Sequence, residues 1–183
     1  MENIFRAGKL FALLVCLIQS TALLAAAAPA RFEVGEFSFA RPEAWQWIEV
    51  TSPMRKAQLR VPDAKAGQPP TEVIFFYFGA GQGGDVQGNV DRWFRQFEGT
   101  REQIQAKTDP VTIGSRKVTY VHAQGTYMSG MPGGPKTPLK DHALLGAIVE
   151  SDKGNVFIRM TGPIETVKKA EPDFKKMVES GLK

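Results

Sequence analysis

Four closely spaced glycines form the motif in this sequence that most resembles a ligand site. Gly79, Gly81 and Gly84 spell G-x-G-x-x-G directly after an apolar run at residues 73–78. Between a strand and a helix, this motif lets backbone amides at the helix N-terminus hold the phosphates of a dinucleotide. The chemistry that this spacing could support is therefore anion binding by main-chain N–H groups.

The residues after the motif do not complete a dinucleotide site. A Rossmann unit needs a second parallel strand soon after the helix, with an acidic residue at its end. Here the helical segment is followed by the polar stretch REQIQAKTDP and then by hairpin patterns. We therefore interpret the glycines as a structural turn and predict no cofactor. Contact with a partner or a small anionic ligand stays open for this turn, whose candidate residues are Gly79, Gly81, Gly83, Gly84 and Asp85.

A second candidate segment is residues 128–140, MSGMPGGPKTPLK. Its many glycines and prolines predict an exposed loop without regular structure. Loops of this length are often functional. Within it, Met131 and Lys136 are the candidate contacts for a ligand or partner.

The two histidines, His122 and His142, do not predict a metal site. If the strands on either side of the long loop pair with Tyr127 near Asp141, His122 faces Gly146. His142 then lies about 13 Å away, at roughly 3.3 Å per residue. Two ligands of one metal must lie much closer, because metal–nitrogen bonds are about 2 Å long. We therefore predict no metal ligand.

No arrangement of nucleophile and base stands out either. A serine triad built from Ser129, Asp141 and His142 lacks a nucleophile elbow, and adjacent strand residues point to opposite faces. The acidic residues show no spacing typical of paired catalytic acids; those considered are Glu72, Asp85, Glu98 and Glu150. We predict no catalytic residue and a non-enzymatic protein. A hydrolase that uses acidic residues remains the less favoured alternative.

The first 30 residues have the pattern of a secretory signal peptide. Arg6 and Lys9 precede an apolar run at residues 10–18, and residues 28–30 read Ala-Pro-Ala, a small-residue cleavage site. This pattern predicts a secreted or periplasmic protein. An uncleaved segment that anchors the chain in the membrane is the alternative. Cys16 lies inside the apolar run, so the mature chain has no cysteine and no disulfide.

Residues 31–183 are predicted to form a single globular domain. A chain of this length buries roughly two-thirds of its extended surface, which is enough for one core. The whole chain has a formal charge of +4, and the first 30 residues contribute +1, which leaves +3 with the basic residues dispersed. Neither a basic patch nor an aromatic-basic motif points to nucleic acid. A membrane contact is expected only through the signal segment, if it stays uncleaved.

The elements around the glycine turn have clear patterns. Residues 73–78 are apolar or aromatic throughout, which is typical of a central strand covered on both faces. Asp85 is a suitable N-cap for the helix that follows. That helix has one apolar stripe at helical spacing, formed by Val86, Val90, Trp93, Phe94 and Phe97.

Other segments complete an α+β pattern of an antiparallel β-sheet flanked by two main helices. Residues 62–70 form a polar loop, and a helix begins near Pro163 and continues to Leu182. Pro172 should kink or divide this helix. Because the predicted strands are joined by short turns, they should be antiparallel. They occupy residues 36–39, 45–51, 57–61, 111–113, 118–127, 142–150 and 156–161.

Several stretches resemble a known family. FSFARPEAW resembles the start of the PsbP-like domain, shared by an extrinsic protein of photosystem II and the Mog nuclear-transport factor, and the later order of elements is similar. FYFGAGQGGDVQGNVDRWFRQF and LLGAIVE more closely resemble uncharacterised exported bacterial proteins of this kind. The resemblance covers residues 32–183 and implies a PsbP-like α/β/α sandwich. Because the matching motifs are structural, no functional residue carries over.

Together these features predict an exported, non-enzymatic binding or assembly module. Known PsbP-like members mostly act as binding or assembly factors. The resemblance therefore implies such a role for this chain. The partner would be an unidentified protein or small ligand in the cell envelope. The alternative is a small anionic ligand bound at the turn from Gly79 to Asp85.

Overall fold

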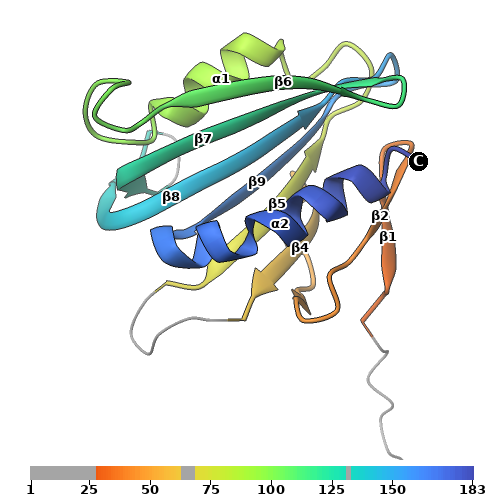
Figure 1. Cartoon of the computed structure of the whole chain (residues 1–183), viewed down its shortest axis with the longest axis horizontal. Helices are drawn as coiled ribbons and strands as arrows, with labels where there is room; N and C mark the ends of the chain where they lie inside the picture. Colours follow the sequence, from red (N-terminus) through yellow and green to blue (C-terminus); the bar gives the residue numbers. More distant parts are fainter. Residues whose placement is uncertain (1–27, 63–68, 131–132) are drawn as a thin grey trace, which may run out of the picture.

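The structure is a computed structural model that describes residues 28–62, 69–130 and 133–183. In these ranges the chain forms a seven-stranded sheet whose neighbouring strands are all antiparallel, as predicted (Figure 1). Signal residues 1–27 and most of the predicted loop at 62–70 lie outside the described ranges. In spatial order the strands are β3 (Gln46–Trp47), β4 (Arg55–Val61), β5 (Thr71–Tyr77), β9 (Val156–Pro163), β8 (Thr137–Val149), β7 (Arg116–Ser129) and β6 (Lys107–Ile113).

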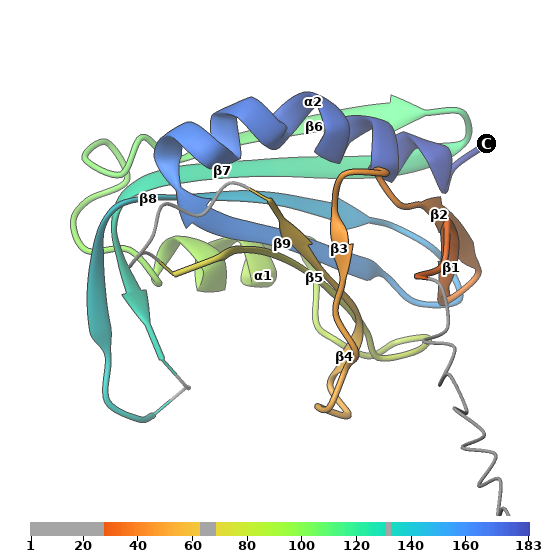
Figure 2. The same ribbon diagram turned by 90° about the horizontal axis from the view of Figure 1, so that it is seen from below.

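The two helices cover opposite faces of this sheet, as Figure 2 shows. Helix α2 (Ile164–Ser180) shares one face with the hairpin of β1 (Arg31–Val34) and β2 (Phe37–Ala40). Helix α1 (Val86–Phe94) packs on part of the other face. The arrangement confirms the expected α+β fold with two flanking helices.

The core under α2 is the larger of the two. It joins apolar residues of the helix, the β1–β2 hairpin and alternate positions of the sheet. Phe32 of β1 meets Phe75 of β5 edge to face, with ring centroids 5.0 Å apart. β1 was not among the predicted strands, although Phe32 and Val34 alternate with Arg31 and Glu33 as a half-buried strand requires.

The core under α1 depends on one close approach between helix and sheet. Val90, Trp93 and Phe94 of α1 are buried against β7, β8 and β9, so the predicted apolar stripe is confirmed. Gly146 of β8 lies under Trp93, and a Cβ atom placed on Gly146 would lie 2.2 Å from Trp93 Cζ3. Only a glycine leaves room for the indole at this position.

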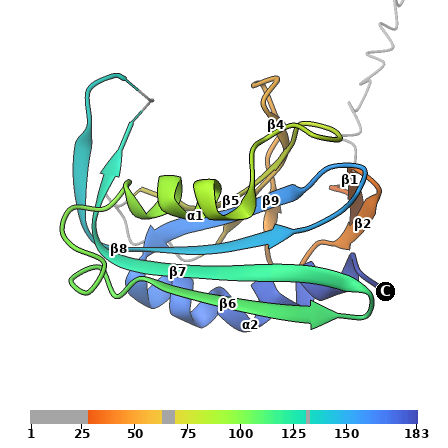
Figure 3. The same ribbon diagram turned by 90° about the horizontal axis from the view of Figure 1, so that it is seen from above.

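The prediction for residues 128–140 was wrong at both ends of this range, and residues 130 and 133–136 keep an irregular, mostly exposed conformation. At these ends, β7 continues to Ser129 and β8 begins at Thr137, with Tyr127 paired to Leu139. Figures 2 and 3 show this end of the hairpin bending away from the sheet toward the side of α1. Pairing of β8 with β9 ends at His142, so the start of β8 has β7 on one side only. A proline such as Pro138 is tolerated there, because an edge position needs no ladder hydrogen bond.

Two other expectations need correction. The strand predicted over residues 45–51 is only β3, two residues long, although Ile48 N still donates to Gln58 O at 3.0 Å. Helix α2 continues through Pro172 instead of dividing there. Pro172 is exposed, while Ala170 and Phe174 beside it are buried. We infer that packing of the apolar face offsets the one lost hydrogen bond on the solvent side.

Two Gly→Ala substitutions should have opposite effects on stability. Gly146→Ala should lower the free energy of unfolding by about 1–3 kcal/mol, because the added methyl group overlaps the Trp93 ring. Gly88→Ala, inside α1, should raise the free energy of unfolding by about 0.5–1 kcal/mol, because the added Cβ atom would lie 3.4 Å from its nearest neighbour, Asp85 Oδ1, and alanine favours the helix. Urea unfolding of both variants measures this; a neutral Gly146→Ala would contradict the described packing.

Candidate functional site

The glycine turn is shaped by its own backbone. Gly79, Gly81, Gly83 and Gly84 all have positive φ, which side chains disfavour. An added Cβ on Gly83 would lie 2.8 Å from the rings of Phe78 and Phe157, whereas Gly79 and Gly81 face open space. The turn therefore needs glycine for conformation and, at Gly83, for packing.

Hydrogen bonds inside the turn occupy the start of α1. Asp85 is the N-cap, as predicted, and its Oδ1 accepts from Gly88 N at 2.7 Å. Asn89, which is buried, donates to the carbonyl oxygens of Gly83 and Asp85. The carboxylate of Asp85 thus lies where an external anion would bind a helix N-terminus. Ligand contact at this turn stays a prediction, and the geometry gives it a structural role without one.

The other predicted contact segment lies at the opposite end of the sheet. Tyr77, just before the glycine turn, pairs with Val156 at the beginning of β9, whereas the β7–β8 hairpin extends past the end of β9. Lys136 in this hairpin donates to Gly130 O at 3.2 Å. Met131 lies outside the described residues. The two segments that the sequence singled out therefore do not form one site.

The assumed register of the two histidines was wrong by one residue. His122 pairs with Leu145, not Gly146, and His142 pairs with Gly125 next to a β-bulge. His142 lies three residues from Leu145, the partner of His122. Because side chains alternate between the faces of a strand, the two imidazoles lie on opposite faces of the sheet. Within the described ranges, no group of three or more His, Cys, Asp or Glu side chains could hold a metal ion.

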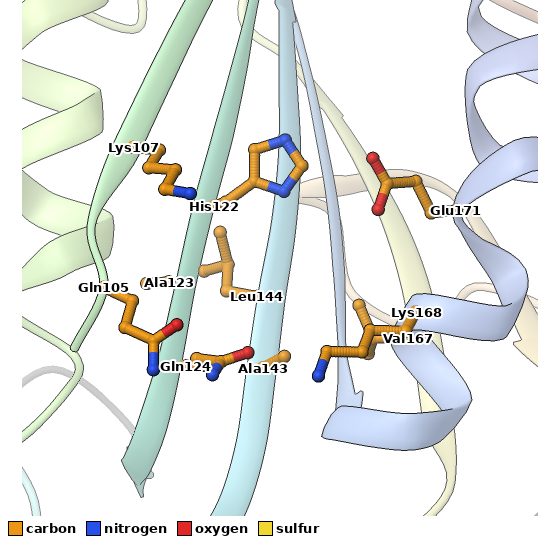
Figure 4. A pocket seen from close by; sticks show the side chains of 10 residues that line it. All are labelled: Gln105, Lys107, His122, Ala123, Gln124, Ala143, Leu144, Val167, Lys168 and Glu171. Carbon is orange, nitrogen blue, oxygen red and sulfur yellow. The ribbon is translucent and has the colours of Figure 1, made fainter.

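His122 lines a groove on the α2 face. We call it the His122 groove; it has a volume of about 330 Å³ and is lined by Lys107 of β6, His122 and Gln124 of β7, and Lys168 and Glu171 of α2, among others. In Figure 4, Glu171 reaches from α2 toward the imidazole of His122. Burial lowers the pKa of His122, and the nearby Glu171 carboxylate partly opposes that shift.

A second cleft lies on the α1 face beside the projecting hairpin. We call it the arginine cleft; its volume is about 380 Å³ and its lining includes Arg55 of β4, Glu72 of β5, Arg159 of β9, and Tyr127 and His142 of the hairpin strands. Because β9 alternates, Ile158 and Met160 enter the α2 core while Arg159 faces this cleft.

Arg159 is a half-buried cation with few partners. Its Nη1 donates to Gln96 Oε1 at 2.9 Å, and the guanidinium lies 5.9 Å from the centroid of the Phe76 ring. Gln96 Oε1 also accepts from Tyr127 Oη at 2.9 Å. Arg159 Nε is buried without a partner among the described residues, and burial lowers the pKa of this guanidinium. The nearest carboxylate in the lining, Glu72, accepts from Gln58 instead.

His142 is a second incompletely paired group in the same lining. It is 7% exposed. Its Nδ1 lies 2.8 Å from Lys140 O and must donate there, because a carbonyl only accepts. Its Nε2 is buried and has no partner in the described part of the chain.

Sequence reasoning missed the arginine cleft. Arg159 interrupts the otherwise apolar VFIRM of β9, which is a signal for a polar group on a covered face. That pattern could not show that Arg55, from a strand about a hundred residues earlier, lines the same cleft.

The groove environment predicts the titration of His122. NMR titration of the protein, assigned with His142→Gln, should give His122 a pKa below the usual 6.5. Glu171→Gln should lower this pKa further, Lys175→Met should raise it, and exposed Lys176→Met should leave it unchanged. Because the pKa of His122 is lower in the folded protein than in the unfolded chain, the unfolded chain binds a proton more readily. The free energy of unfolding is therefore unaffected by this histidine above pH 6.5 and decreases as the pH falls from 6.5 toward the folded-state pKa. A His122 pKa above 6.5 would contradict the burial of the imidazole.

Comparison with solved structures identifies the architecture. The chain matches the solution structure of cyanobacterial PsbP (CyanoP) from Synechocystis sp. PCC 6803 with a TM-score of 0.51 and 10% identity, over 85% of this chain and 94% of that one. A match to the protein of unknown function PA94 from Pseudomonas aeruginosa, described as a putative regulator, has a TM-score of 0.44 and 16% identity, over 82% and 93%. No family model and no curated protein sequence matches. The chain therefore has the PsbP-like fold that its sequence pattern predicted.

Proposed function

We propose that this chain is an exported, non-enzymatic binding module that holds a ligand or partner at the arginine cleft. The observation that carries the proposal is Arg159, a half-buried cation whose hydrogen bond goes to a neutral amide in a cleft of ligand-binding size. Residues of the β7–β8 hairpin form one wall of that cleft.

The hairpin adds features that favour binding of a partner. No described strand pairs with residues 137–141 on the side away from β7, because the pairing with β9 ends at His142. Thr137, Pro138 and Lys140 are exposed, and Tyr127 and Leu139 line the cleft. A strand edge beside a cleft offers main-chain groups and side-chain contacts together.

The lining lacks the paired carboxyl groups that a hydrolase of the acidic type would need. Arginine holds its proton across the accessible pH range and cannot act as a general base. Glu72 is the acidic residue of the lining, and glycosidase chemistry requires a pair of carboxyl groups. Glu150, another acid considered from the sequence, follows the far end of β8. These observations favour binding over hydrolysis.

Export of the chain has a direct test. No helix in the described ranges is long and apolar enough to cross a membrane. We expect the mature protein, recovered from the envelope fraction of an expressing bacterium, to have the intact mass of residues 31–183, or of a chain cut after Ala27. Recovery of the full-length chain from membranes would support the anchored alternative instead.

Photo-crosslinking tests the binding surface. A photo-reactive amino acid at Thr137 should give a discrete adduct in intact cells, because the hairpin borders the cleft. The same residue at Lys176, which is exposed on α2 across the sheet, should give none. Replacing residues 130–136 with Asn-Gly, which closes a hairpin between Ser129 and Thr137, should abolish the adduct with little change in melting temperature. Equal adducts at both positions, or none, would count against the hairpin surface.

A further inference from the structure

We infer that the arginine cleft is a site for a small carboxylate ligand with a short apolar chain, anchored by Arg159. This inference rests on the proposed binding function and adds the chemical class of the ligand. Three properties of the cleft carry it: an uncompensated cation, a second cation beside it, and an apolar wall.

The charge of Arg159 is not balanced inside the protein. A buried charge without an opposite charge is costly, so natural proteins pair it or bind an ion. Across the described ranges, Arg159 has no ion pair; its contacts are the neutral Gln96 amide and the Phe76 ring. Glu72 favours the charged form only through space, because its carboxylate is hydrogen-bonded to Gln58. A bound carboxylate would supply the missing charge.

Arg55 increases the positive potential of the same cleft. Its Nη1 donates to Gln58 Oε1 at 2.6 Å, so the amide of Gln58 links Arg55 to Glu72. The charged side chains of the lining are thus two arginines and one glutamate. Burial and, to a smaller extent, the positive charge of Arg55 lower the pKa of Arg159, because like charges disfavour each other. An anion between them would relieve that repulsion.

Arg159 could instead serve only to join α1 to the sheet through Gln96. That structural role explains one hydrogen bond, but it leaves Arg159 Nε and His142 Nε2 buried and unpaired in one lining. Such groups are rare in native structures, and two together point to an absent partner. A carboxylate oxygen would accept from the Arg159 guanidinium, whereas His142 Nε2 is an acceptor when Nδ1 donates to Lys140 O and would need a donor instead.

The remaining lining limits the rest of the ligand. Ile74, Leu139, Pro69 and Pro70 supply apolar surface next to the polar groups. A volume of about 380 Å³ accommodates a small molecule and not a folded segment. Guanidinium groups bind a planar carboxylate through two parallel hydrogen bonds. Because phosphate can be bound in the same paired way, it is the apolar surface that favours a short-chain carboxylate over free phosphate.

Calorimetric titration of the purified mature protein tests the assignment. Hexanoate should bind with a Kd of about 1 mM or tighter. 1-Hexanol, which has the same chain without the charge, should bind at least about tenfold more weakly, because charge-assisted hydrogen bonds are lost. Inorganic phosphate should also bind at least about tenfold more weakly than hexanoate, since it gains nothing from the apolar wall. Absent hexanoate binding, or equal affinity for hexanol or phosphate, would overturn the inference.

Variants connect the affinity to Arg159. Arg159→Met should weaken hexanoate binding at least about tenfold, while Arg95→Met, an exposed control on α1, should change it little. Unchanged affinity in Arg159→Met would overturn the role of this residue. If Arg159→Met does not fold, Arg159→Lys keeps the charge but not the paired donors, and it should still weaken binding. If photo-crosslinking at Thr137 gives an adduct but calorimetry detects no carboxylate binding, this inference is wrong and the proposed partner surface still stands.

Discussion

The alternation of side chains in β8 and β9 is the constraint on which the rest of the structure depends. Each face of the sheet carries a core, so β8 and β9 each contribute to two cores at once. Ile158 and Met160 complete the core under α2, and Phe157 on the other face packs with α1. Arg159 lies between Ile158 and Met160 in β9, so its side chain must point to the opposite face, the side of α1. A shift of one residue would exchange these faces and bury the guanidinium in the larger core.

The cleft exists because α1 is short and the hairpin is long. Nine residues of α1 cover only part of their face, and β7 and β8 extend past the end of β9. The register shift between Gly125 and Tyr127 re-aims the hairpin, a usual effect of a bulge. Tyr127 and Leu139 therefore stand beside Arg159 instead of continuing the flat sheet. Local irregularity in one hairpin thus turns an uncovered part of the sheet face into a cleft.

The two glycine-rich segments show how similar compositions serve different purposes. At the turn before α1, the glycines have positive φ angles and the Asp85 carboxylate accepts from Gly88 N, so one amide of the helix N-terminus is already paired. In the hairpin, Gly130 and Pro138 stand where one strand edge is open, and the segment still forms a ladder. A high glycine content is compatible with both a turn and a strand pair. The hydrogen-bond partners of the backbone distinguish these two structures.

Local patterns in the sequence determined much of the architecture. The apolar run of β5, the stripe of α1 and the Asp85 cap depend on neighbouring residues, so periodicity and capping chemistry revealed them. The strand at residues 137–141, the undivided helix at Pro172 and the register of His122 depended on contacts between distant segments. The arginine cleft is the clearest case, because Arg55, His142 and Arg159 come from three strands. Only the tertiary structure could bring them together, since nothing in the spacing of residues along a chain encodes which strand edges will pair.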